Sequence, residues 1–177
     1  MAFIDPAQVI PYFELRPDMQ VADFGCGTGA YTMLMSRAIL PNGKVYAIEV
    51  QKDLLITLKN TIAEKHLGNI ELLWADIETV GGSKVADRVL DLVLLSNVLF
   101  QTEDHGYKTS LEVKRVLRPE GRVVLIDWAG SFGNMGPHPD QVITKESARK
   151  IFETAGFQFV KEFPAGDNHY GLILKKA

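Results

Sequence analysis

Glycines and carboxylates recur where apolar segments of this chain end. The run Asp23-Phe24-Gly25-Cys26-Gly27-Thr28-Gly29-Ala30-Tyr31 follows one apolar segment and opens a helix-like one. Glycines at a strand-to-helix turn let a ligand approach the backbone and the positive end of the helix. Glu49 and Asp76 end the next two apolar segments. Because the carboxyl ends of parallel strands meet at one edge of a sheet, these groups are predicted to line one cleft.

The elements that would position these groups alternate between strand-like and helix-like patterns, which predicts βαβ units and a parallel sheet. A short helix is expected after Gly81-Gly82, and Gly68 is expected to end the second helix. Residues 157–163 and 169–174 follow each other without a helix, which predicts a closing antiparallel pair. Predicted strands cover residues 20–24, 44–49, 70–74, 90–96 and 123–127, and predicted helices cover 28–40, 51–66, 107–117 and a segment capped by Thr144.

Asp23 distinguishes between two classes of nucleoside ligand. With Ala30, the glycine loop also satisfies the relaxed dinucleotide fingerprint G-x-G-x-x-G/A. A carboxylate two residues before the first glycine would repel a diphosphate. S-adenosylmethionine has no phosphate and carries an ammonium and a sulfonium, which a carboxylate attracts. The acid therefore favours the sulfonium ligand over a nicotinamide dinucleotide.

At this loop the chain resembles the class I S-adenosylmethionine-dependent methyltransferases, whose first motif has the form acid-x-G-x-G-x-G, here residues 23–29. The resemblance extends over nearly the whole chain and is greatest to the compact ubiquinone/menaquinone-biosynthesis C-methyltransferases. It implies an α/β, Rossmann-like, doubly wound sheet of seven mostly parallel strands, in the order 3-2-1-4-5-7-6 with strand 7 antiparallel. Residues 1–177 would form this single domain, with S-adenosylmethionine as cofactor and S-adenosylhomocysteine as product.

The resemblance also implies roles for individual residues. Glu49 would hold the ribose hydroxyls, and Asp76 with Ile77 would lie against the adenine, where a carboxylate can accept from the exocyclic amine. Ser96 and Asn97 would lie beneath the methionine part. The predicted cofactor-binding residues are Asp23, Gly25, Cys26, Gly27, Gly29, Tyr31, Glu49, Val50, Asp76, Ile77, Ser96 and Asn97.

Two histidines are predicted to contact the methyl acceptor or to remove its proton. His138 lies on the loop that leaves the fifth strand, and His169 begins the antiparallel last strand, so both belong to the ligand-binding edge. Because methyl transfer depends largely on positioning, a strong base is not required. No metal is predicted, since Asp127 and Asn134 offer two oxygens without a third ligand at a recognisable spacing.

Composition limits the partners and the compartment. The chain has 177 residues, a formal net charge of −3 and one cysteine. This charge argues against nucleic acid, the cysteine count fits the cytoplasm, and no apolar run reaches the roughly 18 residues that cross a bilayer. The expected partner is a small-molecule methyl acceptor. Neither the identity of this acceptor nor the oligomeric state follows from the sequence. A nicotinamide-dependent oxidoreductase and a non-catalytic S-adenosylmethionine-binding module stay open as alternatives.

Overall fold

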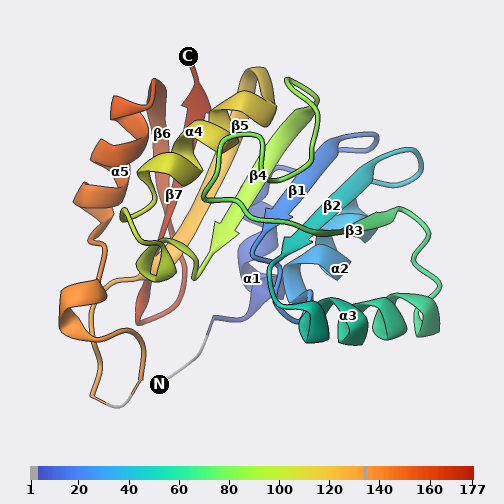
Figure 1. Cartoon of the computed structure of the whole chain (residues 1–177), viewed down its shortest axis with the longest axis horizontal. Coiled ribbons are helices and arrows are strands. Elements are labelled where there is room, and N and C mark those ends of the chain that lie inside the picture. The colour runs from blue at the N-terminus through green and yellow to red at the C-terminus, as the bar shows by residue number, and fades with distance from the viewer. Residues whose placement is uncertain (1–3, 134) are drawn as a thin grey trace.

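A computed structural model of the chain describes residues 4–133 and 135–177, so Asn134 lies outside the described residues. Seven strands form one sheet in the order β3-β2-β1-β4-β5-β7-β6 (Figure 1). Neighbouring strands from β3 to β5 pair in parallel, and β7 pairs antiparallel with both β5 and β6. The predicted order and the antiparallel last strand are therefore confirmed. The strands are β1 (Gln20–Phe24), β2 (Lys44–Glu49), β3 (Ile70–Trp74), β4 (Leu90–Ser96), β5 (Leu117–Trp128), β6 (Phe157–Pro164) and β7 (His169–Lys176).

Helices cover both faces of the sheet, as a parallel sheet requires. Side chains of α1, α2 and α3 pack on one face, and those of α4 and α5 pack on the other. Three short 3-10 helices lie in the connections. The α-helices are α1 (Pro6–Val9), α2 (Ala30–Ala38), α3 (Lys52–Glu64), α4 (Tyr107–Val116) and α5 (Lys145–Thr154), and the 3-10 helices are η1 (Ile10–Phe13), η2 (Leu99–Gln101) and η3 (Pro139–Gln141).

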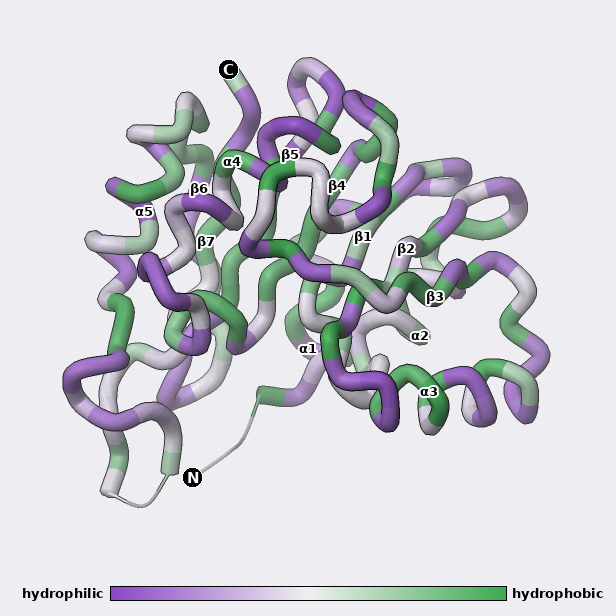
Figure 2. Tube along the Cα trace, viewed as in Figure 1, coloured by the Kyte–Doolittle hydropathy of each residue, from purple (hydrophilic) through white to green (hydrophobic). Residues whose placement is uncertain are grey.

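The core is densest around the central strands. In β4, the side chains of alternate residues point to opposite faces of the sheet. Val93 and Leu95 pack toward α4 and α5, and Leu92 and Leu94 pack toward α1 and α2. Figure 2 shows hydrophobic residues along these strands and hydrophilic residues over most of the connecting loops. Among the described residues, no helix is long and apolar enough to cross a membrane.

Several predicted details are corrected by the structure. The helix after β2 ends at Glu64, and the left-handed residue beyond it is His66 (φ 52°), not Gly68. The segment after Gly81-Gly82 forms turns and no helix. β5 begins at Leu117, because Leu117 pairs with Leu90 before the expected turn and the pairing resumes at Arg122 with a register shift.

Candidate functional site

A pocket of about 420 Å³ lies at the carboxyl ends of β1, β2, β3 and β4. This is the edge where open α/β sheets bind their ligands. Of the predicted cofactor residues, eight line the pocket: Gly25, Gly27, Glu49, Val50, Asp76, Ile77, Ser96 and Asn97. The structure thus brings together residues from four separate strand ends.

The glycine loop follows the path that its sequence requires. Gly25 and Gly29 have φ values of +75° and +81°, which side chains of L-residues rarely adopt. A Cβ at Gly25 would lie 2.7 Å from Cγ2 of Val98, and a Cβ at Gly29 would lie 2.3 Å from Cδ1 of Leu58. Both positions therefore need glycine for space as well as for conformation.

Glu49 connects the end of β2 to that loop. Its Oε2 accepts from the Gly27 N–H at 3.0 Å, and its Oε1 accepts from the N–H groups of Val50 and Gln51 at 2.8 and 3.0 Å. The side chain is nearly buried, yet it lines the pocket. A carboxylate has roughly four acceptor positions, so three backbone bonds leave it able to accept from a ligand hydroxyl.

The segment after β3 forms the opposite wall. Ala75, Asp76, Ile77 and Glu78 line the pocket. Oδ1 of Asp76 accepts from the Glu78 N–H at 2.8 Å, and Oδ2 accepts from the Thr79 hydroxyl at 3.1 Å. The wall therefore combines an apolar surface with carboxylate oxygens, which suits a planar base that carries N–H groups.

Asn97, just after β4, presents an unsatisfied acceptor. Its backbone is left-handed (φ 58°), and its N–H donates to the Ile126 carbonyl at 2.8 Å. Its side-chain Oδ1 is buried and has no hydrogen-bond partner among the described residues. Because buried polar atoms are almost always paired, this oxygen is suited to a donor from a bound molecule.

Four predicted cofactor residues do not line the pocket: Asp23, Cys26, Gly29 and Tyr31. Asp23 is 2% exposed and its Oδ2 accepts from the Thr32 hydroxyl at 2.6 Å. Burial raises the pKa of Asp23 to about 6, although the Thr32 bond opposes the shift. Burial also raises the pKa of the Cys26 thiol, which makes it a poor nucleophile. The side chains of Asp23, Cys26 and Tyr31 are therefore buried in the protein and do not face the pocket.

His169 lies in a second pocket, of about 570 Å³, at the ends of β5, β6 and β7 and the start of α5. Its ring lies against Trp128, with ring centroids 4.2 Å apart. Its Nε2 and the hydroxyl of the adjacent Tyr170 are buried without partners among the described residues. Burial lowers the pKa of His169 to about 4, so the ring is neutral at pH 7.

His138 is exposed and pairs with Asp140 beside η3, and it lines neither of these two pockets. Among the described residues, no group of three or more His, Cys, Asp or Glu side chains could hold a metal ion. Sequence reasoning missed Gln101, the last residue of η2, and Thr102, which follows it, and both line the first pocket. Their position in the connection after the fourth strand could have indicated a place near the pocket, but they belong to no recognisable sequence motif.

The charged side chains that line the first pocket are all acidic. Glu49, Asp76 and Glu78 line it, and no Lys, Arg or His is among its described lining residues. Such a surface repels a diphosphate and attracts hydroxyl, amine and cationic groups. S-adenosylmethionine offers ribose hydroxyls, an adenine amine, an ammonium and a sulfonium, so the donors it carries match the acceptors present here.

Comparison with known proteins agrees with this chemistry. The model of the family described as "Methyltransferase domain" matches residues 15–166. The demethylmenaquinone methyltransferase of Lactococcus lactis is 29% identical over 160 residues, which cover 90% of this chain and 58% of the relative. The arsenite methyltransferase of Halobacterium salinarum is 24% identical over 168 residues, covering 87% of this chain and 41% of the relative. The chain thus spans about half the length of these relatives.

A solved structure covers the chain more completely. The crystal structure of a SAM-dependent methyltransferase from Aquifex aeolicus superposes with a TM-score of 0.88 at 26% sequence identity, over 99% of this chain and 91% of that one. The sheet order, the acidic pocket and the family match lead to one assignment. The chain belongs to the methyltransferase domain family, within the class I fold whose cofactor is S-adenosylmethionine.

Proposed function

We propose that this chain transfers the methyl group of S-adenosylmethionine to a nucleophilic atom of a small molecule. The observation that carries the proposal is the first pocket, where acceptor oxygens from several strand ends surround a glycine loop and no cationic side chain is among the described lining residues. When bound, S-adenosylmethionine supplies an electrophilic methyl group on a positively charged sulfur.

The protein's own residues would bind and orient this cofactor. Glu49 would accept from the ribose hydroxyls, and Asp76 and Ile77 would hold the adenine through its amine and its ring face. Asn97 Oδ1 and the Ser96 hydroxyl would accept from the ammonium end. The loop at Gly25 and Gly27 would let the ligand approach the backbone closely. Holding both reactants in line can supply most of the catalysis.

Asp23 has an indirect part in this proposal. Its buried carboxylate does not line the pocket and accepts from the Thr32 hydroxyl, so its negative charge would act on the ammonium over a distance or through water. A buried charge is screened less than an exposed one, and its attraction for a cation is correspondingly stronger. Tyr31 and Cys26 would support the loop by packing, beneath the ligand.

For the acceptor, the second pocket offers the better of the two predicted histidines. The Nε2 atom of His169 has no hydrogen-bond partner among the described residues. Because its lowered pKa makes the ring a weak base at pH 7, His169 would orient an acceptor by hydrogen bonding instead of taking up its proton. His138 is the weaker candidate because its exposed ring pairs with Asp140. The curated relatives are named for acceptors as different as demethylmenaquinone and arsenite, so neither name transfers to this chain.

We infer the class of partner and the compartment from the net charge and the cysteine content. A net charge of −3 disfavours nucleic acid as the acceptor, and one buried cysteine fits a reducing compartment such as the cytoplasm. The nicotinamide alternative is weakened by the carboxylates that a diphosphate would meet. A non-catalytic binding module would share the pocket and differ in turnover.

The test of methyl transfer uses S-adenosylmethionine with an isotopically labelled methyl group. The whole chain is incubated with separate sets of phenols, amines, thiols and activated carbon acids, and mass spectrometry follows the label and S-adenosylhomocysteine. Labelled product together with an equal amount of S-adenosylhomocysteine supports the proposal. Tight binding of S-adenosylhomocysteine with no transfer to any set would favour the non-catalytic module.

A further inference from the structure

We infer that Glu112 of α4 is a positioning residue for the cofactor pocket, because its buried carboxylate fixes the segment that carries the Asp76 wall. The inference rests on the proposed function, since it assigns a purpose to that wall. Glu112 does not line the pocket and would act only through residues 76–83.

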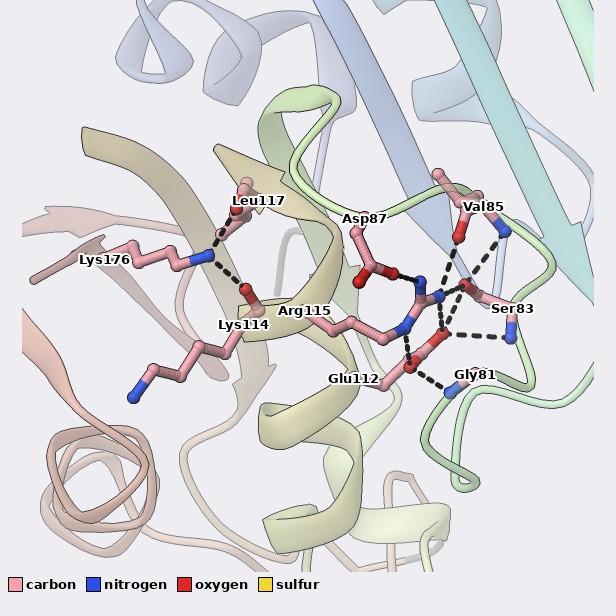
Figure 3. A network of polar contacts seen from close by, with 9 residues as sticks. All are labelled: Gly81, Ser83, Val85, Asp87, Glu112, Lys114, Arg115, Leu117 and Lys176. Carbon is pink, nitrogen blue, oxygen red and sulfur yellow. Dashed lines mark hydrogen bonds and ion pairs between the residues drawn. The ribbon is translucent and has the colours of Figure 1, made fainter. Parts of the chain in front are cut away.

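Glu112 accepts hydrogen bonds from residues 81–83, which belong to a segment without helix or strand. Its side chain is fully buried. Oε2 accepts from the Gly81 N–H at 2.6 Å, and Oε1 accepts from the Ser83 N–H at 3.1 Å and from the Ser83 hydroxyl (Figure 3). One carboxylate thus replaces the ladder of hydrogen bonds that regular structure would have provided to this segment.

Arg115, one helical turn further along, balances the charge. Its Nε donates to Glu112 Oε2 at 2.8 Å, and its Nη2 donates to Glu112 Oε1 at 2.7 Å and to the Val85 carbonyl at 2.8 Å (Figure 3). Burial pushes the pKa of Glu112 up, but hydrogen bonds from Arg115, Ser83 and Gly81 outweigh it and hold the pKa at about 2. The carboxylate is therefore ionised throughout the physiological range.

The anchored residues connect directly to the pocket wall. The Gly82 N–H donates to the Thr79 carbonyl at 2.8 Å, and the Thr79 hydroxyl donates to Asp76 Oδ2 at 3.1 Å. Gly82 also passes so close to the wall that a Cβ there would lie 2.3 Å from the Asp76 carbonyl. Displacing Gly81 or Ser83 would therefore move the Thr79–Asp76 contact.

A second link joins this segment to the other side of the pocket. Oε2 of Glu78 accepts from the Glu103 N–H at 3.0 Å, just after Gln101 of η2 and Thr102, which also line the pocket. The wall is thus held from α4 at one end and from the η2 turn at the other. Because burying charges has a desolvation cost, the Glu112–Arg115 pair is weak evidence for added stability, and the role of Glu112 is inferred from its bonds to Gly81 and Ser83.

The first test is hydrogen exchange on the protein without ligand. Glu112→Gln keeps the shape of the side chain and removes its charge. Should that variant fold poorly, Ser83→Ala removes the hydroxyl that donates to Glu112 and accepts from the Val85 N–H and Arg115. We expect amides of residues 76–83 to exchange about tenfold or more faster in Glu112→Gln, with peptides of β4 and β5 unchanged. Unchanged exchange of residues 76–83 would overturn the inference, whatever the cofactor proves to be.

The second test separates positioning from general stability. Titration calorimetry compares S-adenosylhomocysteine with its inosine analogue, which lacks the adenine amine. We expect Glu112→Gln to bind S-adenosylhomocysteine about tenfold more weakly and to lose most of its preference over the analogue. The control Phe152→Leu, a fully buried change in α5, should lower Tm and keep that preference.

Two results would separate the claims. If Glu112→Gln and Phe152→Leu lower Tm alike and both keep the full preference, Glu112 has a structural role only and the inference is wrong. If the parent protein binds neither compound, the proposed function fails, and the exchange experiment still decides whether Glu112 fixes the wall.

Discussion

The Glu49 carboxylate accepts the Gly27 N–H at 3.0 Å, so the acid at the end of β2 and the glycine loop after β1 form one unit. The sequence predicted a ribose-binding acid that faces an open cleft. The structure shows that the same side chain also holds the turn at Val50 and Gln51. Its replacement should therefore affect both the shape of the pocket and its chemistry.

Glu49→Ala is expected to weaken S-adenosylhomocysteine binding on the order of 10-fold to 1,000-fold, because it removes both acceptor oxygens of the side chain and frees three backbone donors. Glu49→Gln should be intermediate, since its single amide oxygen still accepts. Titration calorimetry measures both. Glu71→Gln is the matched control, because it removes the same charge from β3 outside the pocket. Parent-like affinity in folded Glu49→Ala would show that the ribose assignment is wrong.

Asp23 should make folding stability depend on pH. Its pKa in the folded protein, about 6, lies above the 3.8 of a free aspartate, so its favourable contribution is present below pH 4 and is lost as the pH rises through 6. Relative to the parent, Asp23→Asn should therefore gain about 2 kcal/mol of unfolding free energy between pH 4 and pH 7. Urea unfolding at several pH values measures the difference. A constant difference would mean that Asp23 is not buried as described.

Asp23 should also influence the cofactor. If its ionised form attracts the ammonium, S-adenosylhomocysteine should bind more tightly to the parent as the pH rises through 6, and this trend should be absent in Asp23→Asn. Glu49 is the other carboxylate whose charge acts on Asp23, and it is present in both proteins. Calorimetry at pH 5 and pH 7 suffices, and identical trends in the two proteins would count against the charge argument.

Tyr170→Phe tests the second pocket. The change deletes a buried hydroxyl that has no described partner, so the unliganded protein should be as stable as the parent or slightly more stable. If the acceptor bonds to this hydroxyl, its KM should rise while S-adenosylhomocysteine affinity stays the same. His169→Ala should likewise lower turnover more than cofactor affinity. An acceptor KM unchanged in both variants would place the acceptor elsewhere.

The glycine loop offers a paired comparison. Gly29→Ala meets both a left-handed backbone and the Leu58 side chain, so it should cost about 2 to 5 kcal/mol of unfolding free energy. Gly27→Ala meets only the left-handed backbone, with no atom within 4 Å of the added Cβ, and should cost about 1 to 2 kcal/mol. Urea unfolding ranks the two variants, and the opposite rank would contradict the described packing.

The first four strands could be predicted to the residue because buried parallel strands are short apolar runs with clear ends. The run 90–96, for example, is apolar apart from Asp91 and Ser96 and corresponds to β4. Helix ends were predicted less well. Gly68 looked like the end of α3, but the backbone turned at His66, which a polar side chain tolerates when the local bonds are satisfied.

The site was predictable where a residue type had to stand at a strand end. The strand pattern placed Glu49 and Asp76 at strand ends, the resemblance to the methyltransferases gave them their roles, and both line the pocket. Glu112 could not be found in this way. With Arg115 three residues on, it has the pattern of an exposed ion pair on a helix, and its burial depends on where the segment around Ser83 folds back. Such long-range contacts leave no local signal.

The most direct test of the central claim is calorimetric titration of the parent chain with S-adenosylhomocysteine and, separately, with NAD⁺. The acidic pocket predicts saturable binding of S-adenosylhomocysteine at one site per chain, weakened in Glu49→Ala, and no measurable binding of NAD⁺ at the same concentrations. Saturable binding of NAD⁺ without binding of S-adenosylhomocysteine would contradict the account.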